Sequence, residues 1–151
     1  VKYGVGSWNN GLKVMREYAG SVGLDVNKWV FEDASGMSHA NKIPSSQLSL
    51  LLHKVRSEPW YGSLLRGMPI AGGYDRFVGG TLRTRLKLAP AKNNVIAKTG
   101  SLDNVSSLAG YAKTKDGEWL IFTIQTQNTK SSTVPVIDRM AAAIANSKTT
   151  N

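Results

Sequence analysis

The tripeptide Lys98-Thr99-Gly100 is the part of the sequence whose residue types could do chemistry at one place. It ends a predicted strand, because the apolar run Val95-Ile96-Ala97 comes directly before it. On such a strand, a lysine supplies a fixed positive charge that attracts a carboxylate, and a threonine hydroxyl can hydrogen-bond the same group. A glycine leaves room for another backbone to lie against the strand. The tripeptide alone arises by chance in roughly a few per cent of chains this long, so its surroundings decide its meaning.

Most other reactive constellations are missing from the 151 residues. There is no cysteine, which removes disulfides, thiol nucleophiles and thiolate metal sites. The two histidines, His39 and His53, do not form a pair at metal-ligand spacing, so we expect no metal and no cofactor. The sequence has no Gly-rich phosphate loop, and its ten acidic residues are too scattered to argue a carboxylate pair for glycoside chemistry.

The chain is strongly basic, with 19 Lys and Arg against 10 Asp and Glu and a net charge of +9. Seven of the cations lie between Arg66 and Lys98, where Asp75 is the one acid. Such a stretch attracts nucleic acid, an acidic polymer or a substrate carboxylate, and it can equally be a solvated surface. The aromatic rings near it, Tyr74 and Phe77, are too few for a platform that stacks single-stranded nucleic acid. The sequence contains no run of eighteen apolar residues and therefore indicates no membrane span.

Apolar residues at three- and four-residue spacing predict helices on both sides of the tripeptide. The expected ranges are 9–22, 45–56, 60–66 and 134–146. Ser45 is expected to cap the second helix after Pro44. The apolar face of the last helix is expected to hold Ile137, Met140, Ala141 and Ile144.

Strands are predicted over residues 29–33, 94–99, 107–115 and 118–127. The last two flank Asp116-Gly117, and because glycine accepts a positive φ this pair is typical of a two-residue hairpin turn. Residues 67–90 contain two glycine pairs and are expected to be a loop. The order of helices, loop, antiparallel sheet and helix predicts an α+β fold with helices packed on an antiparallel sheet.

Around the tripeptide, further short segments follow one another in a fixed order. They are Gly6-Ser7-Trp8, Asp33-Ala34-Ser35-Gly36-Met37-Ser38-His39-Ala40-Asn41, Met68-Pro69-Ile70-Ala71-Gly72, Gly80-Thr81-Leu82-Arg83-Thr84-Arg85, Ala97-Lys98-Thr99-Gly100-Ser101-Leu102 and Ser107-Leu108-Ala109-Gly110-Tyr111. Together they resemble the C-terminal portion of serine-type D-alanyl-D-alanine carboxypeptidases/endopeptidases, the class C low-molecular-mass penicillin-binding proteins. That family usually has Asp-Gly where this chain has Asp33-Ala34. The resemblance implies part of the serine β-lactamase/DD-peptidase (transpeptidase-like) fold.

Two of the family's three catalytic motifs are not found. In Ser-x-x-Lys the lysine activates the nucleophilic serine, but no serine of this chain has a lysine three positions later. Ser7-Trp8-Asn9 fits the second motif, Ser-x-Asn, by its letters, but it occupies the Gly-Ser-Trp position and is interpreted as coincidence. Ser38 is assigned to the structural Asp-x-Ser-Gly segment. We therefore expect residues 1–151 to be the C-terminal part of a DD-peptidase domain whose Ser-x-x-Lys and Ser-x-Asn segments lie upstream.

The resemblance implies a peptidoglycan hydrolase that acts through an acyl-enzyme on stem peptides ending in D-Ala-D-Ala. Lys98 would be catalytic, and Thr99, Gly100 and Ser101 would bind substrate, with the Ser101 N–H as one donor of the oxyanion hole. The resemblance also implies β-lactams as inhibitors, no nucleic-acid partner, and an extracytoplasmic location in the periplasm or cell wall. The isolated chain is expected to be inactive and either poorly stable or self-associated in a domain-swapped form, because it would lack the central helix that packs on the sheet.

Two alternatives stay open at the level of the sequence. A related class C β-lactamase would use Tyr-x-Asn, which none of the five tyrosines begins, although that motif too could lie upstream. A non-enzymatic basic module that binds an anionic polymer or nucleic acid would explain the charge of +9 but not the ordered segments. Carboxypeptidase and endopeptidase activity are not distinguished by these residues.

Overall fold

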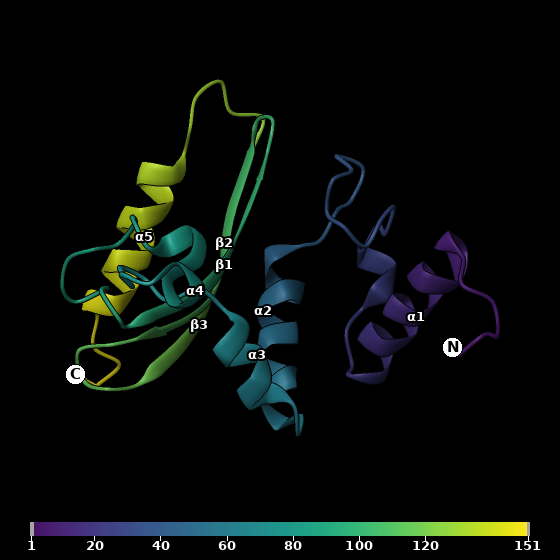
Figure 1. Ribbon diagram of the computed structural model, residues 1–151, viewed down its shortest axis with the longest axis horizontal. Coiled ribbons are helices and arrows are strands. Elements are labelled where there is room, and N and C mark those ends of the chain that lie inside the picture. Colours follow the sequence, from purple (N-terminus) through teal and green to yellow (C-terminus); the bar gives the residue numbers. More distant parts are fainter. Residues whose placement is uncertain (1, 151) are drawn as a thin grey trace. The chain divides into compact units, whose positions relative to one another are not determined.

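The computed structural model describes residues 2–150 (Figure 1). They form two compact units, of which the first ends at Val55 and the second begins at Arg56. Each unit has its own cluster of buried apolar side chains, so each is described by itself. The second unit contains the sheet and the Lys98-Thr99-Gly100 tripeptide.

The first unit is built from two helices, α1 (Trp8–Ser21) and α2 (Ser45–Lys54), with a 3-10 turn (Val26–Lys28) between them. The Ser7 hydroxyl accepts a hydrogen bond from the Asn10 N–H at 3.2 Å and caps α1. The helix lies within one residue of its predicted range at each end. Its buried face is the one that the apolar spacing indicated.

Helix α2 begins at its predicted residue, but its cap and its end differ from the prediction. Pro44 stands at the cap position and Ser45 is the first helical residue, so Ser45 is not the cap. The backbone of Pro44 is extended, with φ −60° and ψ 139°, and the helical conformation therefore begins only at the next residue. The α-helix ends at Lys54, and a 3-10 turn (Val55–Ser57) follows where the sequence predicted helix up to residue 56.

Residues 29–33 do not form the predicted strand. Every second side chain is buried, as in a strand, but the segment pairs through a single bridge between Val30 and Lys42. Beyond this bridge the Asn41 side-chain oxygen accepts the N–H groups of residues 32 and 33, at 2.8 and 3.2 Å. A side chain therefore takes the place of the next backbone partner, and the ladder stops after one bridge.

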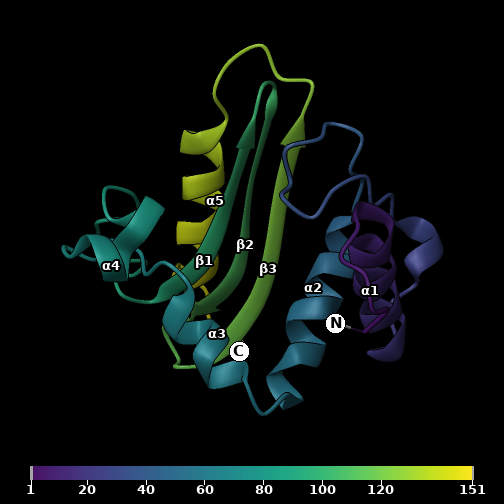
Figure 2. The same cartoon turned by 45° about the vertical axis from the view of Figure 1, so that its right-hand side comes forward.

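The second unit contains a three-stranded antiparallel sheet with the strand order β1-β2-β3 (Figure 2). The strands are β1 (Val95–Leu102), β2 (Val105–Lys113) and β3 (Trp119–Gln127). The three predicted strands are confirmed, but β1 and β2 extend further toward their shared turn. There Asn104 adopts a φ of 61°, and the missed signal is Asp103-Asn104, since these residue types favour turns.

The turn between β2 and β3 has three residues rather than the predicted two. Thr114 and Glu118 still pair, because the Thr114 N–H donates to the Glu118 carbonyl at 2.8 Å, and residues 115–117 connect them. Gly117 ends this loop with a φ of 91°. A glycine in this conformation at the last position is typical of three-residue hairpin loops.

Helix α5 (Val134–Asn146) packs along one face of the sheet (Figures 1 and 2). Its fully buried side chains are Ile137, Ala141 and Ala145, which repeat every four residues and form one stripe. Met140 was predicted on this face, but it is 49% exposed. The prediction for Met140 was wrong, because the buried stripe follows the four-residue spacing from Ile137 to Ala145 and Met140 lies outside it.

The remaining elements of the second unit precede β1. They are α3 (Tyr61–Gly67), a single turn of helix α4 (Arg76–Gly79) and a 3-10 turn (Gly80–Leu82). The predicted short helix is confirmed by α3. The two later turns correct the expectation that residues 67–90 are only a loop.

Candidate active-site wall

The Lys98-Thr99-Gly100 tripeptide lies within β1, at one edge of the sheet. Residues 69–71 pair with the first half of this edge, where the Ala97 N–H donates to the Pro69 carbonyl at 3.0 Å. The N–H groups of a strand alternate between its two sides. Those of Thr99 and Ser101 therefore point the same way as that of Ala97, along the part of the edge that lies beyond residues 69–71. We call this part, from Lys98 to Ser101, the open edge of β1.

The Lys98 side chain is exposed, and its ammonium donates to the Thr99 carbonyl oxygen at 2.6 Å. Lys98 lies on the face of the sheet opposite α5, because its neighbour Ala97 is fully buried in the core that α5 covers. The positive charge is thus held at the open edge, close in sequence to the outward-pointing N–H of Ser101.

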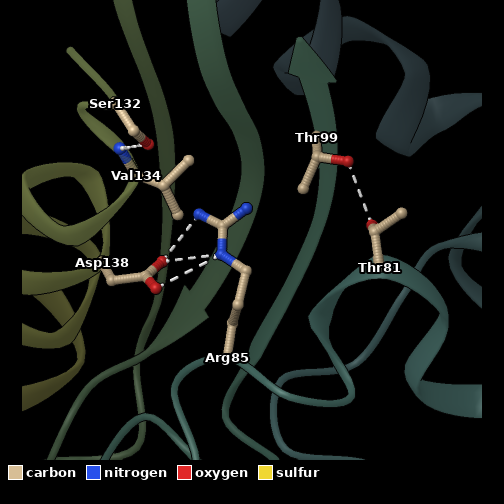
Figure 3. Close-up of polar contacts among 6 residues, drawn as sticks. All are labelled: Thr81, Arg85, Thr99, Ser132, Val134 and Asp138. Atoms are coloured by element: carbon tan, nitrogen blue, oxygen red, sulfur yellow. Dashed lines mark hydrogen bonds and ion pairs between the residues drawn. The ribbon is translucent and has the colours of Figure 1, made fainter.

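A second hydroxyl meets the tripeptide at Thr99. The Thr99 hydroxyl donates to the hydroxyl of Thr81 at 3.0 Å (Figure 3). Thr81 belongs to the 3-10 turn (Gly80–Leu82), which the fully buried side chain of Leu82 anchors in the core. Gly80 has a φ of 47°, a conformation that residues with a Cβ atom rarely adopt. The conformation of Gly80 and the burial of Leu82 therefore explain the Gly-Thr-Leu sequence, and together they bring Thr81 to β1.

Arg85 forms a forked ion pair with Asp138 of α5 (Figure 3). Its Nη2 lies 2.7 Å and its Nε 3.1 Å from Oδ1 of Asp138, and both side chains are largely shielded, with 17% and 23% exposed. The sequence interpretation counted Arg85 among the cations that an anionic substrate could use. This is corrected, because the carboxylate of Asp138 already balances the charge of Arg85, whereas Arg83 is exposed.

Two glycines lie where β1 and β2 approach closely. A Cβ added at Gly110 would lie 2.2 Å from the carbonyl oxygen of Ile96, which is backbone and cannot move aside. A Cβ added at Gly100 would lie 2.5 Å from the hydroxyl oxygen of Ser107, which can rotate. The sheet itself therefore requires Gly110, while at Gly100 a side chain is disfavoured only as long as Ser107 keeps its rotamer.

In the first unit, the residues around Asp33 form a loop closed by their own hydrogen bonds. The Asp33 carboxylate accepts the N–H groups of Gly36 at 2.5 Å and Ser38 at 2.6 Å, and the Ser35 hydroxyl at 3.1 Å. Burial raises the pKa of Asp33, but these hydrogen bonds outweigh it and bring the pKa below its ordinary value. The geometry agrees with a structural role for Ser38. Similarly, Ser7 caps a helix, in keeping with the interpretation of Ser7-Trp8-Asn9 as coincidence.

A cavity of about 270 Å³ lies on the face of the sheet opposite α5. Its lining residues are Arg56, Tyr61, Leu65, Ile96, Tyr111 and Trp119. The rings of Tyr61 and Tyr111 meet edge to face, with centroids 5.8 Å apart, and burial raises the pKa of Tyr111 well above its ordinary value. Sequence reasoning missed this cavity, because two tyrosines far apart in the chain carry no joint signal.

Among residues 2–150, no group of three or more His, Cys, Asp or Glu side chains could hold a metal ion. No helix in the same range is both long and apolar enough to cross a membrane. The groups gathered at the open edge of β1 are an ammonium, hydroxyls and backbone N–H groups.

A helix packed on an antiparallel sheet whose edge strand carries Lys-Thr-Gly is typical of the serine β-lactamase/DD-peptidase class. Comparison with family models agrees, since the D-Ala-D-Ala carboxypeptidase 3 (S13) family matches residues 2–148, and the chain belongs to this family. The resemblance and the α+β fold class predicted from the sequence are thereby confirmed. The alternative of a non-enzymatic basic module is not favoured.

Known relatives span far more than this chain. It is 33% identical over 142 residues to the D-alanyl-D-alanine carboxypeptidase of Actinomadura sp. (strain R39), covering 94% of this chain and 26% of the relative. It is 34% identical over 119 residues to D-alanyl-D-alanine carboxypeptidase DacB of Haemophilus influenzae, covering 77% and 24%. The chain thus spans about a quarter of the length of these curated relatives.

Solved structures share the fold. Penicillin binding protein 4 (dacB) from Haemophilus influenzae, complexed with a β-lactam, has a TM-score of 0.74 at 27% identity, covering 87% of this chain and 31% of that one. A predatory endopeptidase from Bdellovibrio bacteriovorus, complexed with its immunity protein, has a TM-score of 0.69 at 24% identity, covering 91% and 37%. At this lower identity the second comparison supports the fold alone.

Proposed function

We propose that the protein containing this chain is a serine-type D-Ala-D-Ala carboxypeptidase/endopeptidase that processes peptidoglycan through an acyl-enzyme. In this proposal the chain supplies one wall of the active site, the open edge of β1. The observation that carries the proposal is the open edge of β1, along which Lys98, Thr99 and Ser101 follow one another and the N–H groups of Thr99 and Ser101 point outward. Membership of the carboxypeptidase family supports the same chemistry.

Each group at the open edge has a task in this reaction. The Lys98 ammonium attracts the terminal carboxylate of the substrate and favours proton transfer near the nucleophile. The Thr99 hydroxyl donates its one hydrogen to that carboxylate when the Thr81 hydroxyl turns to donate to Thr99 instead. The Ser101 N–H donates to the oxyanion of the tetrahedral intermediate. Gly100 presents no side chain, so the substrate backbone can lie along β1.

The nucleophile comes from outside this chain. A serine hydroxyl of an upstream Ser-x-x-Lys segment attacks the carbonyl carbon of the penultimate D-Ala, and the proton of the hydroxyl passes to the leaving amine as the peptide bond breaks. Water then attacks the resulting ester, which releases the shortened peptide and restores the serine. No serine of this chain has a lysine three positions later, and Ser7 of Ser7-Trp8-Asn9 caps α1, which supports a position of both motifs outside this chain.

The same proposal extends to inhibitors and location. β-Lactams acylate the serine, because their strained amide carbonyl meets the same groups as the substrate. The protein acts outside the cytoplasmic membrane, in the periplasm or cell wall, where peptidoglycan lies. Apart from the rest of the protein, the chain is inactive and is either poorly stable or self-associated, since the rest of the protein would contribute the central helix that packs on the sheet.

Intact-mass spectrometry after incubation with benzylpenicillin tests the proposal. We expect one penicillin adduct on the full-length protein and none on the isolated 151-residue chain. An adduct on the isolated chain would show that one of its own serines is the nucleophile, and Ser7 and Ser38 would then be the first to replace by alanine. A full-length protein that gains no adduct would contradict the proposed activity itself.

The role of Lys98 has a matched control. We expect Lys98→Ala to slow penicillin acylation of the full-length protein by roughly 100-fold, the usual effect of removing one group that stabilises the transition state. Lys113 is also exposed on the sheet, at the far end of β2, and Lys113→Ala should leave the rate unchanged. Equal effects of the two substitutions would remove Lys98 from the site.

A further inference from the structure

The segment of residues 73–92, between α3 and β1, exposes large apolar side chains. Tyr74 is 90% exposed, Phe77 88% and Leu88 81%, whereas no other large apolar side chain described in the second unit exceeds 49%. Surfaces where several such side chains gather mark binding sites more often than isolated ones do. The three exposed side chains therefore mark a candidate binding surface.

The first part of this surface combines a ring with two ammonium groups. The Lys92 ammonium donates to the Tyr74 hydroxyl at 3.0 Å and lies 4.6 Å from the centroid of its ring. Lys87 is adjacent, because a Cβ added at Gly72 would lie 3.3 Å from Cα of Lys87 and 3.0 Å from Cγ of Lys92. The hydrogen bond from Lys92 and the charges of both lysines lower the pKa of Tyr74. The cluster is positively charged and carries a flat apolar face.

The second part lies on α4. The guanidinium of Arg76 is 5.6 Å from the centroid of the Phe77 ring. Asp75, the only acid in the segment, accepts the Phe77 N–H at 2.6 Å and caps this helical turn. One further cation, Arg85, is balanced by Asp138. Besides Arg85, the segment carries Arg76, Arg83, Lys87 and Lys92 against Asp75, so four positive charges against one negative charge leave a surplus of three.

The surface belongs to the segment that flanks β1. Thr81, which hydrogen-bonds Thr99, belongs to the same segment, and residues 69–71, which pair with β1, come directly before it. Gly72, which lies beside Lys87 and Lys92, comes directly after the paired residues, so this cluster and the open edge lie on either side of the pairing with β1. We call these residues the aromatic-basic surface: Tyr74, Arg76, Phe77, Lys87, Leu88 and Lys92.

We propose that the aromatic-basic surface binds the polymer to which the substrate peptide is attached, a glycan strand whose stem peptides carry carboxylates. Aromatic rings pack against the apolar faces of sugar rings, and the cations pair with the carboxylates. The inference rests on the proposed function, because only an enzyme of polymeric peptidoglycan needs a grip on the strand beside the site that holds the peptide end. It predicts a preference for polymer over short soluble peptides.

The test is co-sedimentation of the full-length protein with purified peptidoglycan sacculi freed of attached polymers. We expect Tyr74→Ser/Phe77→Ser and Lys87→Ser/Lys92→Ser each to weaken binding at least fivefold, and the lysine pair to make binding less sensitive to salt. Matched controls are Val136→Ser/Met140→Ser and Lys113→Ser/Lys130→Ser, which remove exposed apolar side chains and charges elsewhere in the second unit. These controls should bind within twofold of the unchanged protein.

Several results would overturn the inference. They are unchanged sacculus binding in both surface variants, equal losses in the controls, and tighter binding of the unchanged protein to phosphatidylglycerol vesicles or single-stranded DNA than to sacculi. A fall of the thermal midpoint in Tyr74→Ser/Phe77→Ser alone would mean that the rest of the protein covers the surface. Penicillin acylation of the same proteins keeps the two proposals apart, since it reports the proposed activity and penicillin is too small to reach along the strand.

Discussion

Arg85 and Asp138 are joined by a forked ion pair that fastens the segment before β1 to helix α5. Three residues before Arg85 in the same segment, Leu82 is fully buried, and its neighbour Thr81 hydrogen-bonds Thr99. The C-terminal helix and the edge strand thus hold one segment from two sides. The position of Thr81 beside the open edge depends on both contacts.

Breaking this ion pair from one side should destabilise the protein. We expect Asp138→Asn to lower the free energy of unfolding by roughly 1–3 kcal/mol, because it leaves a shielded guanidinium without its counter-charge. Arg85→Met/Asp138→Leu should cost less than Asp138→Asn, since no unpaired charge remains. Urea unfolding measures both. The exposed pair Lys28–Asp25 provides the control, and Lys28→Gln should change the free energy by less than about 0.5 kcal/mol.

Thr81 should orient the hydroxyl of Thr99. We expect Thr81→Val to slow penicillin acylation of the full-length protein by roughly tenfold, because the Thr99 hydroxyl loses the partner that holds it at the edge. Thr81→Ser keeps a hydroxyl and should retain most of the rate. Thr84→Val changes an exposed threonine of the same segment and serves as the control. If Thr81→Val and Thr81→Ser were equally slow, the hydroxyl would not be the group that matters.

The absence of a side chain at Gly100 should matter for two separate reasons, the stability of the sheet and the acylation reaction. We expect Gly100→Ala to destabilise the sheet by about 1–2 kcal/mol, because the new Cβ meets the Ser107 hydroxyl. Combining it with Ser107→Gly should recover most of the stability in denaturant unfolding. Acylation by penicillin should remain impaired in the combined variant, because the methyl group still occupies the open edge. Full recovery of both would leave Gly100 with a role in packing alone.

Asp33 should make the stability of the protein depend on pH in the acid range. Its pKa is lower in the folded protein than in the unfolded chain, so its stabilising effect is complete above the unfolded pKa of about 4 and is lost as the pH falls through the folded pKa. Thermal midpoints of the unchanged protein and of Asp33→Asn should therefore differ most near pH 7 and converge well below pH 4. A constant difference down to pH 2 would contradict this.

The sheet and the last helix could be predicted because their signals are local. Alternating apolar residues before and after Asp116-Gly117 indicate two neighbouring strands, and the α5 stripe repeats at helical spacing. Residues 29–33 carry the same alternation but form one bridge, because the side chain of Asn41 satisfies the next backbone groups. Alternation indicates an extended backbone, and only the partner decides whether a ladder forms.

The tripeptide of the candidate site could be found from its spacing, but its surroundings could not. Thr81 and Thr99 meet across 18 positions, and Arg85 and Asp138 across 53. No local pattern predicts which polar groups the fold brings together over such separations. The same applies to Tyr61 and Tyr111, which line the cavity on the opposite face from α5.

The pairing of residues 69–71 with β1 limits the length of peptide that can pair with the sheet edge. It uses the edge as far as Ala97, and the strand itself ends at Leu102. In the remainder, the residues whose backbone groups face outward are Thr99 and Ser101. The edge left free for pairing is therefore only a few residues long and is blocked at one end. Such an edge suits the terminus of a peptide and excludes the middle of a folded chain.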